Sequence, residues 1–178
     1  MSNCNSKIFL APVSSFDLYK NYQRTVMVGI DKTDFLKYQN ANQYQKLLTQ
    51  NHTVRIWGIK STKLTPYNKA SINDIVLFYH KGFMIGRATI SFKDNNQNLS
   101  KEIWGYDQDK LKNKIEYWEN LIFLENFGVI NMSFKVLIDY ASFSPKASVR
   151  GFNEYSQIGT NALLKEHGNI ENFLCKYQ

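Results

Sequence analysis

Cysteine is scarce in this sequence, and its two copies are not placed to work together. Cys4 and Cys175 stand near opposite ends of the 178 residues. They lack the paired spacing of a zinc site and the even, repeated pattern of a secreted disulfide framework. We therefore expect no metal site and no disulfide scaffold.

Long apolar runs are also missing. No stretch approaches the about 20 consecutive apolar residues that a membrane-spanning helix needs. Residues 1–7 are polar, without the basic start and apolar run of a signal peptide. These absences predict a cytoplasmic protein that makes no contact with a membrane.

Motifs for catalysis are absent as well. The chain contains no GxxxxGK[ST], GxSxG, HExxH or GxGxxG. None of its 15 acidic residues is followed two positions later by lysine, so half of a common metal-dependent nuclease site is missing. The three histidines are scattered, and the one close acid pair, Asp107 and Asp109, lies among lysines as on a solvated surface. We expect no catalytic residues and no cofactor, and hence a binding module instead of an enzyme.

Positive charge and aromatic residues are plentiful. The chain has 22 Lys and Arg against 15 Asp and Glu, a net charge of +7, which favours a polyanion such as nucleic acid as the partner. An inert basic surface is the alternative. A hydrophobic fraction of 43% and an aromatic fraction of 15% indicate a folded chain, and the length fits a single domain over residues 1–178.

The order of apolar patterns predicts an α+β fold, because strands and helices do not alternate. The turn signal His80-Lys81-Gly82 predicts an antiparallel hairpin, and Ser14-Ser15 offers a helix N-cap. The Asn-rich residues 93–100 are expected to form a loop. Strands are predicted at 7–13, 53–60, 74–80, 84–92 and 121–124, and helices at 17–22, 32–38, 43–49, 132–141 and from Thr160 and Asn169.

Aromatic side chains concentrate beside lysines in residues 55–90, and they could form ordinary core or a pocket. Trp57 shares strand parity with Ile59 and Ser61, so it fits either role. Trp118, next to the apolar run 121–124, is predicted to be core. The sequence pattern alone leaves the pocket undecided.

Three motifs in order resemble a known family. They are the strand end Ile59-Lys60-Ser61, the hairpin strand Phe83-Met84-Ile85-Gly86-Arg87-Ala88, and Ile103-Trp104-Gly105 after a loop. This order is similar to YTH and EVE domains of the PUA-like superfamily, which bind modified bases in aromatic cages. Ala11-Pro12-Val13-Ser14 and Arg150-Gly151-Phe152 further resemble the EVE-like N-terminal domains of McrB-type modification-dependent restriction systems. The likeness covers most of residues 7–155 and implies a small, mostly antiparallel sheet or partly open barrel flanked by helices.

The resemblance implies a DNA-binding domain that recognises a methylated adenine or cytosine flipped out of the duplex. Its implied partners are methylated double-stranded DNA and, in the full system, an AAA+ GTPase domain and a nuclease subunit, with this chain as the N-terminal part of a longer protein. One alternative is a PUA-like or YTH-like reader of modified RNA. Another is a small nucleic-acid enzyme whose catalytic residues match no common motif.

The resemblance also implies roles for particular residues. Trp104 matches a later cage tryptophan in order, and Tyr67 is the aromatic nearest to a second cage position, where this chain reads Thr65-Pro66-Tyr67-Asn68. The expected base-binding residues are Trp57, Lys60, Ser61, Thr62, Tyr67, Tyr79 and Trp104. Lys63, Lys69, Lys81 and Arg87 are expected at the DNA backbone, against the alternative of a solvated rim.

Overall fold

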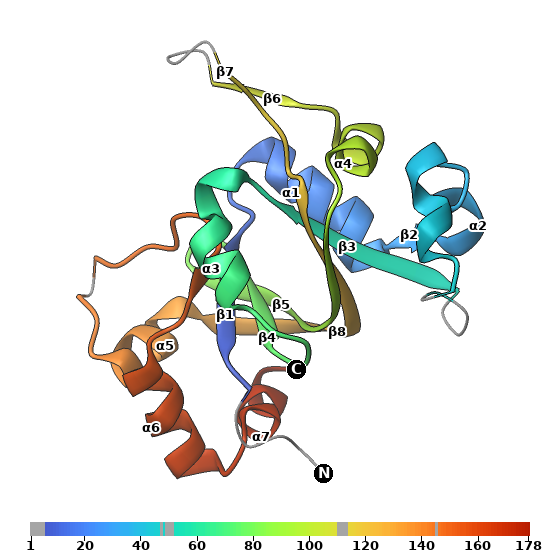
Figure 1. The fold of residues 1–178 in the computed structure, drawn as a ribbon. Helices are drawn as coiled ribbons and strands as arrows, with labels where there is room; N and C mark the ends of the chain where they lie inside the picture. Colours follow the sequence, from blue (N-terminus) through green and yellow to red (C-terminus); the bar gives the residue numbers. More distant parts are fainter. Residues whose placement is uncertain (1–5, 47, 49–51, 110–113, 145) are drawn as a thin grey trace.

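The computed structural model describes residues 6–46, 48, 52–109, 114–144 and 146–178, and it has an α+β architecture (Figure 1). This confirms the fold class predicted from the sequence. The strands are β1 (Ile8–Pro12), β2 (Ile30–Asp31), β3 (Thr53–Ile59), β4 (Ile75–His80), β5 (Phe83–Asn95), β6 (Asp107–Asp109), β7 (Lys114–Glu116), β8 (Asn120–Ser133) and β9 (Asn153–Glu154). The α-helices are α1 (Phe16–Tyr22), α2 (Lys32–Phe35), α3 (Leu64–Lys69), α4 (Gln97–Trp104), α5 (Phe134–Ala141), α6 (Gln157–His167) and α7 (Ile170–Leu174).

Seven of these strands form one mixed sheet in the order β2-β3-β8-β5-β4-β1-β9, and β6 and β7 form a separate hairpin. Within the seven-stranded sheet, β1 and β4 pair in parallel and the other neighbours pair antiparallel. The predicted β4–β5 hairpin is confirmed. Its turn residues Lys81 and Gly82 both have positive φ, 44° and 94°, as a two-residue hairpin turn requires.

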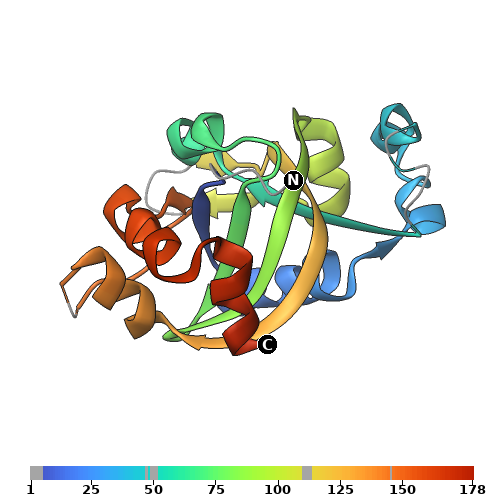
Figure 2. The same ribbon diagram turned by 90° about the horizontal axis from the view of Figure 1, so that it is seen from below.

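The sheet curls strongly enough to enclose a core (Figure 2). Trp57 on β3 and Phe78 on β4 are separated by β8 and β5 in the strand order, yet their ring centroids lie 5.7 Å apart. The interior is filled by side chains from β1, β3, β4, β5 and β8, and Tyr22 of α1 packs against them. The result is a partly open barrel whose interior reaches the end of β3.

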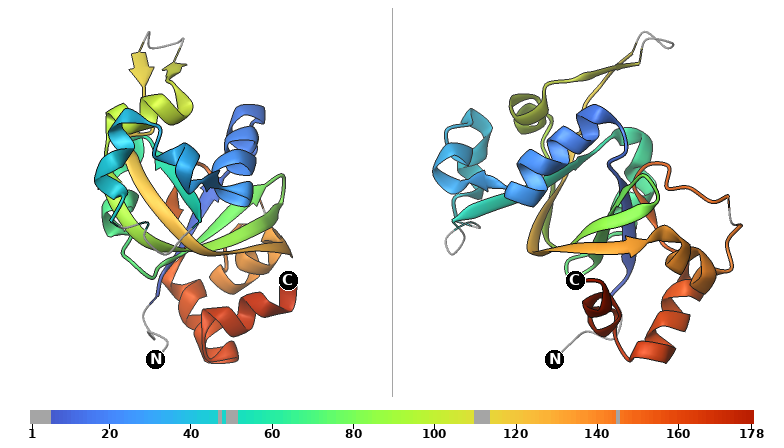
Figure 3. Two further views of the ribbon diagram at one scale, coloured as in Figure 1. Left: turned by 90° about the vertical axis from the view of Figure 1, so that its right-hand side faces the viewer. Right: turned by 180° about the vertical axis from the view of Figure 1, so that it is seen from behind.

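Helices cover the outside of this curled sheet in two groups (Figure 3). Helices α5, α6 and α7 pack together against β1, β4 and the far end of β8. Helices α2 and α4 cover the outer face of β3 and β8, where Phe35, Leu99 and Ile103 meet Ile56 and Phe123. Among the described residues, every helix is too short or too polar to cross a lipid bilayer.

The prediction of a loop at residues 93–100 was wrong. Residues up to Asn95 continue β5, and α4 begins directly afterwards. The side chain of Asn96 accepts a hydrogen bond from the backbone N–H of Leu99 at 2.9 Å and so caps the helix. Leu99 and Ile103, four residues apart, are both buried, and this shared face holds α4 on the sheet.

Other boundaries differ from the expected ones. Strand β8 runs well beyond the predicted residues 121–124, and α5 begins at Phe134 because Ser133 caps it. The predicted helix at 43–49 is replaced by a 3-10 helix at Gln39–Tyr44, and residues 47 and 49 lie outside the described part of the chain. Residues 64–69, for which no helix or strand was predicted, form α3.

Candidate functional site

A cavity of about 590 Å³ opens where the end of β3 meets the start of α1 and the base of the β6–β7 hairpin. All three tryptophans of the chain line it: Trp57, Trp104 and Trp118. They come from β3, from the last position of α4, and from the segment before β8. The other lining residues are Pro12, Ser15, Asp17, Leu18, Lys20, Asn21, Gly58, Ile59, Lys60, Thr62, Lys63, Tyr106, Asp107, Gly151 and Phe152.

The inner wall of the cavity is buried and closely packed. Trp57 is only 6% exposed and packs edge-on against Phe78 in the interior of the sheet. Phe152 is buried and stacks on Phe9 with ring centroids 5.1 Å apart. Trp104 and Trp118, by contrast, are half-buried and leave part of each indole open. The cavity therefore combines a buried apolar floor with two accessible aromatic walls.

Gly58 allows the two open tryptophans to approach the strand. A Cβ placed on Gly58 would lie 2.5 Å from Cβ of Trp118, 2.8 Å from its carbonyl oxygen and 2.8 Å from Cζ3 of Trp104. Any side chain at this position would push the indoles outward. The absence of a side chain at residue 58 is therefore a condition for this geometry.

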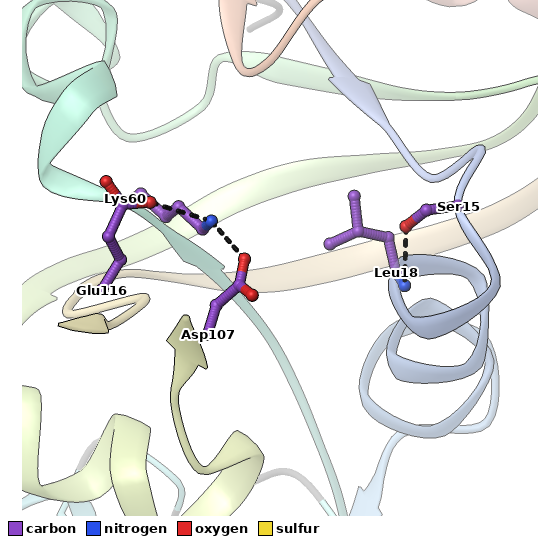
Figure 4. Close-up of polar contacts among 5 residues, drawn as sticks. All are labelled: Ser15, Leu18, Lys60, Asp107 and Glu116. Carbon is purple, nitrogen blue, oxygen red and sulfur yellow. Dashed lines mark hydrogen bonds and ion pairs between the residues drawn. The ribbon is translucent and has the colours of Figure 1, made fainter. Parts of the chain in front are cut away.

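Two further contacts position the walls. Arg24 donates a hydrogen bond from its guanidinium to the carbonyl oxygen of Ile103 at 2.5 Å, which fixes the end of α4 beside Trp104. On the opposite side, the Ser15 hydroxyl accepts a hydrogen bond from the backbone N–H of Leu18 at 3.3 Å (Figure 4). Ser15 is thus the N-cap of α1, as the sequence predicted, and this cap presents Leu18 and Asn21 to the cavity.

Lys60 ties the β6–β7 hairpin to the end of β3 (Figure 4). Its Nζ donates to Oδ2 of Asp107 at 2.5 Å and to Oε2 of Glu116 at 3.0 Å, and these two acids face each other across the hairpin. The same Nζ lies 5.5 Å from the ring centroid of Trp118. Burial alone would lower the pKa of Lys60, but the hydrogen bonds and charges of the two carboxylates outweigh it and raise this pKa.

We expect Lys60→Met to lower the free energy of unfolding by about 1 kcal/mol at neutral pH, since two charge-assisted bonds in a partly exposed site are lost. Because the folded-state pKa is raised above 10.5, the stabilisation is present below that pH and declines as pH rises through the folded value. Urea unfolding of both proteins between pH 7 and pH 11 measures this. A difference that grows above pH 10.5 would contradict the assignment.

The structure brings part of the predicted base-binding set together. Trp57, Lys60, Thr62 and Trp104 all line the cavity. The remaining three lie elsewhere. Ser61 donates a hydrogen bond to Glu119, Tyr67 is buried with its hydroxyl donating to the carbonyl oxygen of Asp94 at 2.9 Å, and Tyr79 packs on Phe134 of α5. These three were predicted at the base-binding site, and they stand outside the cavity walls.

The four cations predicted at the DNA backbone also do not all lie at the cavity. Lys63 lines the cavity. Lys69 lies 3.7 Å from a carboxylate oxygen of Glu154, and Arg87 is paired at 2.7 Å with Glu171 of α7. Lys81 stands in the β4–β5 turn. Of these four cations, only Lys63 therefore lines the same cavity as the tryptophans.

The prediction that Trp118 belongs to the core was wrong. The residue is half-buried and lines the cavity, because it precedes β8 and lies against Gly58 on the neighbouring strand. Sequence reasoning also missed Gly58, Lys20, Asn21 and Tyr106. One signal for Trp118 was available: it sits between Tyr117 and Glu119, before the apolar run begins, which is typical of a strand end.

Where the structure describes the cavity lining, it does not gather metal ligands. Among residues with described positions, no group of three or more His, Cys, Asp or Glu side chains could hold a metal ion. The two acids that line the cavity are Asp17 and Asp107. Asp107 is already engaged by Lys60, which leaves Asp17 as an acceptor facing the cavity.

No family model matches the chain, and no curated protein matches it. Among solved structures, the N-terminal domain of Thermococcus gammatolerans McrB bound to m5C DNA aligns with a TM-score of 0.65 and 16% identity, over 95% of this chain and 99% of that one. A YTH domain, of Zygosaccharomyces rouxii MRB1 in complex with N6-methyladenosine RNA, aligns with a TM-score of 0.48 and 14% identity, over 93% and 89%. ASCH from Zymomonas mobilis aligns with a TM-score of 0.43 and 9% identity, over 90% and 96%. The chain thus has the fold of the McrB N-terminal domain, and the resemblance predicted from the sequence is confirmed at the level of the fold.

Proposed function

We propose that this chain is a DNA-binding module that holds a methylated base, flipped out of a duplex, between its tryptophans. The observation that carries the proposal is the convergence of all three tryptophans on one cavity with lysines beside it. The McrB domain of the same fold was solved bound to m5C DNA, which supports DNA as the ligand.

The chemistry of the cavity suits an extrahelical base. Flipping a base costs a few kcal/mol of lost pairing and stacking, and this cost is offset by about 1–3 kcal/mol for each base stacked on an aromatic ring. Trp104 and Trp118 are the open faces available for stacking, whereas Trp57 and Phe152 form an apolar floor that accepts a methyl group. Asp17, Asn21 and Thr62 lie where they can hydrogen-bond to the polar edge of the base.

Lys20 and Lys63 are positioned to contact the phosphates that flank the flipped nucleotide. Lys20 is exposed on α1, and the stem of Lys63 lies against Gly151, where a Cβ would come within 2.3 Å of Cε. Phosphate contacts supply affinity without reading sequence, which leaves discrimination to the tryptophans.

We expect binding to any duplex to weaken with salt. Two neutralised phosphates give a slope of about −1.8 in a plot of log K against log salt, which corresponds to an about tenfold loss from 50 to 200 mM. Fluorescence anisotropy of a labelled duplex at several salt concentrations measures the slope. An affinity that stays flat over this range would count against phosphate contacts.

The larger assembly is also part of the proposal. We infer a modification-dependent restriction system of the McrB type, in which an AAA+ GTPase domain and a nuclease subunit cut DNA in the cytoplasm after this domain has located the methylated base. The support for it is the shared fold together with a cavity suited to binding.

The test is a binding panel with one duplex that carries adenine, N6-methyladenine, cytosine or 5-methylcytosine at a single position. We expect one methylated duplex to bind more tightly than its unmodified counterpart. Tighter binding to methylated RNA of the same sequence would favour an RNA reader instead. Turnover of a labelled oligonucleotide by the pure domain, abolished by changing one polar cavity residue, would favour an enzyme.

A further inference from the structure

Large apolar side chains that the fold does not bury lie on the elements that border the cavity. Phe16 at the start of α1 is 81% exposed, Tyr106 before β6 is 62% exposed, and Ile115 on β7 is 51% exposed. Phe16 is the most exposed of the large hydrophobic residues in the described part of the chain. The start of α1 faces the base of the hairpin across the cavity (Figure 4).

The position of Phe16 is fixed by its neighbours. Ser15 and Asp17, on either side in the sequence, both line the cavity, and the Ser15 cap holds this first turn in place. Lys20 lies one helical turn after Phe16, so the two side chains share a face of α1, and Lys20 also lines the cavity. An apolar ring therefore stands beside an exposed cation at the mouth.

The other aromatic side chains of α1 are packed. Tyr22 is buried against Phe78, and the ring of Tyr19 lies 4.4 Å from that of His80. Phe16, by contrast, points its ring into solvent. Its exposure keeps apolar surface in water, and this is unfavourable unless a ligand covers the ring.

We propose that Phe16 is the wedge that enters the base stack of a duplex and fills the space left by the flipped nucleotide. The inference rests on the proposed function, because without a flipped base there is no space to fill. Apolar side chains that insert between base steps are a general means of stabilising distorted duplexes. Lys20, on the same face, would then contact the phosphate next to the vacated position.

A wedge residue should affect binding to a duplex but not to a single strand, whereas a residue of the cavity wall should affect both. A duplex loses stacking when a base leaves it, whereas a single strand presents the same base without a gap in a helix. Removal of the Phe16 ring should therefore weaken binding to duplex and leave binding to the single strand unchanged. Comparison of the two substrates isolates the role of the ring.

The experiment compares Phe16→Ala, Phe16→Leu and Ile158→Ala with the unchanged protein. Ile158 is 71% exposed on α6, at the opposite end of the molecule from the β6–β7 hairpin (Figure 1), and it is the matched control. Each protein is titrated with a duplex and with a single strand that carry the same single methylated base, and its melting temperature is recorded. We expect Phe16→Ala to bind the duplex about tenfold more weakly, to bind the single strand normally and to melt normally. Phe16→Leu should retain most duplex affinity, and Ile158→Ala should match the unchanged protein.

Two results would overturn the wedge while leaving the proposed function intact. One is normal duplex binding by Phe16→Ala. The other is an equal loss on duplex and single strand, which would make Phe16 part of the base pocket itself. If the unchanged protein shows no preference for a methylated base on either substrate, the proposed function fails, and the wedge fails with it.

Discussion

Replacing Trp104 with alanine should reduce the preference for methylated over unmodified duplex by about 5- to 150-fold, with little change in melting temperature. The range corresponds to the about 1–3 kcal/mol that one stacked base gains from an aromatic ring. Trp104 is half-buried at the very end of α4 and packs against the edge of a cluster in which Leu99 and Ile103 are the fully buried residues of that helix. The fold should therefore tolerate the substitution. Thermal melting and the ratio of two dissociation constants measure both quantities.

Comparing Trp118→Ala with Trp104→Ala tests whether both tryptophans are walls of the cavity. Because Trp118 is the second open wall of the cavity, this variant should also lose preference for the methylated duplex. It should cost some stability, because the lost indole is half-buried and lies 5.5 Å from Nζ of Lys60. This differs from a core deletion, which would lower the free energy of unfolding by about 3–5 kcal/mol and leave the cavity walls in place. If Trp104→Ala melts early and keeps its preference, Trp104 is a packing residue and the stacking role is wrong.

Gly58→Ala should damage both folding and binding, although it adds a single methyl group. The new Cβ would meet the backbone of Trp118 at 2.8 Å, and backbone cannot rotate away. Overpacking of this kind costs about 1–3 kcal/mol. Since Trp104 and Trp118 would both be displaced, we expect the preference for a methylated base to fall by at least about tenfold.

Gly128→Ala on β8 is the control for this substitution. The three atoms nearest to a Cβ at Gly128 belong to the flexible side chains of Arg87 and Gln178, at 3.3 Å and beyond. We expect unchanged binding and equal or slightly higher stability, because alanine restricts the unfolded chain more than glycine does. Equal behaviour of the two variants would show that the space beside Gly58 is not needed.

Local signals explain which parts of the fold could be predicted. The β4–β5 hairpin depends on the turn residues Lys81 and Gly82, and the start of α1 depends on the hydrogen bond that the Ser15 side chain accepts from the backbone N–H of Leu18. The turn residues and the helix cap each lie within a few residues of the element that they determine. The Asn-rich segment 93–100 was wrongly predicted to be a loop, because its structure depends on contacts that are not local. Helix α4 is held by burial of Leu99 and Ile103 against α2 and β8, and those contacts come from distant parts of the chain.

The difference between local signals and contacts from distant parts of the chain also explains which cavity residues were predicted. Trp57 and Trp104 were predicted to bind the base, but Trp118 was assigned to the core because an apolar strand follows it. Its actual place depends on the pairing of β3 with β8, which puts it against Gly58, a residue much earlier in the chain. Tyr67 was expected to supply a cage wall. It instead turns into the core, and Trp118 and Tyr106 join Trp104 in lining the cavity.

The intrinsic tryptophan fluorescence of the chain offers the most direct measurement. Because all three tryptophans line the same cavity, their emission reports on that cavity. Titration with a duplex that carries a methylated base should quench the emission saturably as the flipped base stacks on the indoles. An unmodified duplex, held through phosphates, should bind with little quenching. Binding of the methylated duplex, followed by anisotropy, with unchanged tryptophan emission would contradict a base held between the tryptophans.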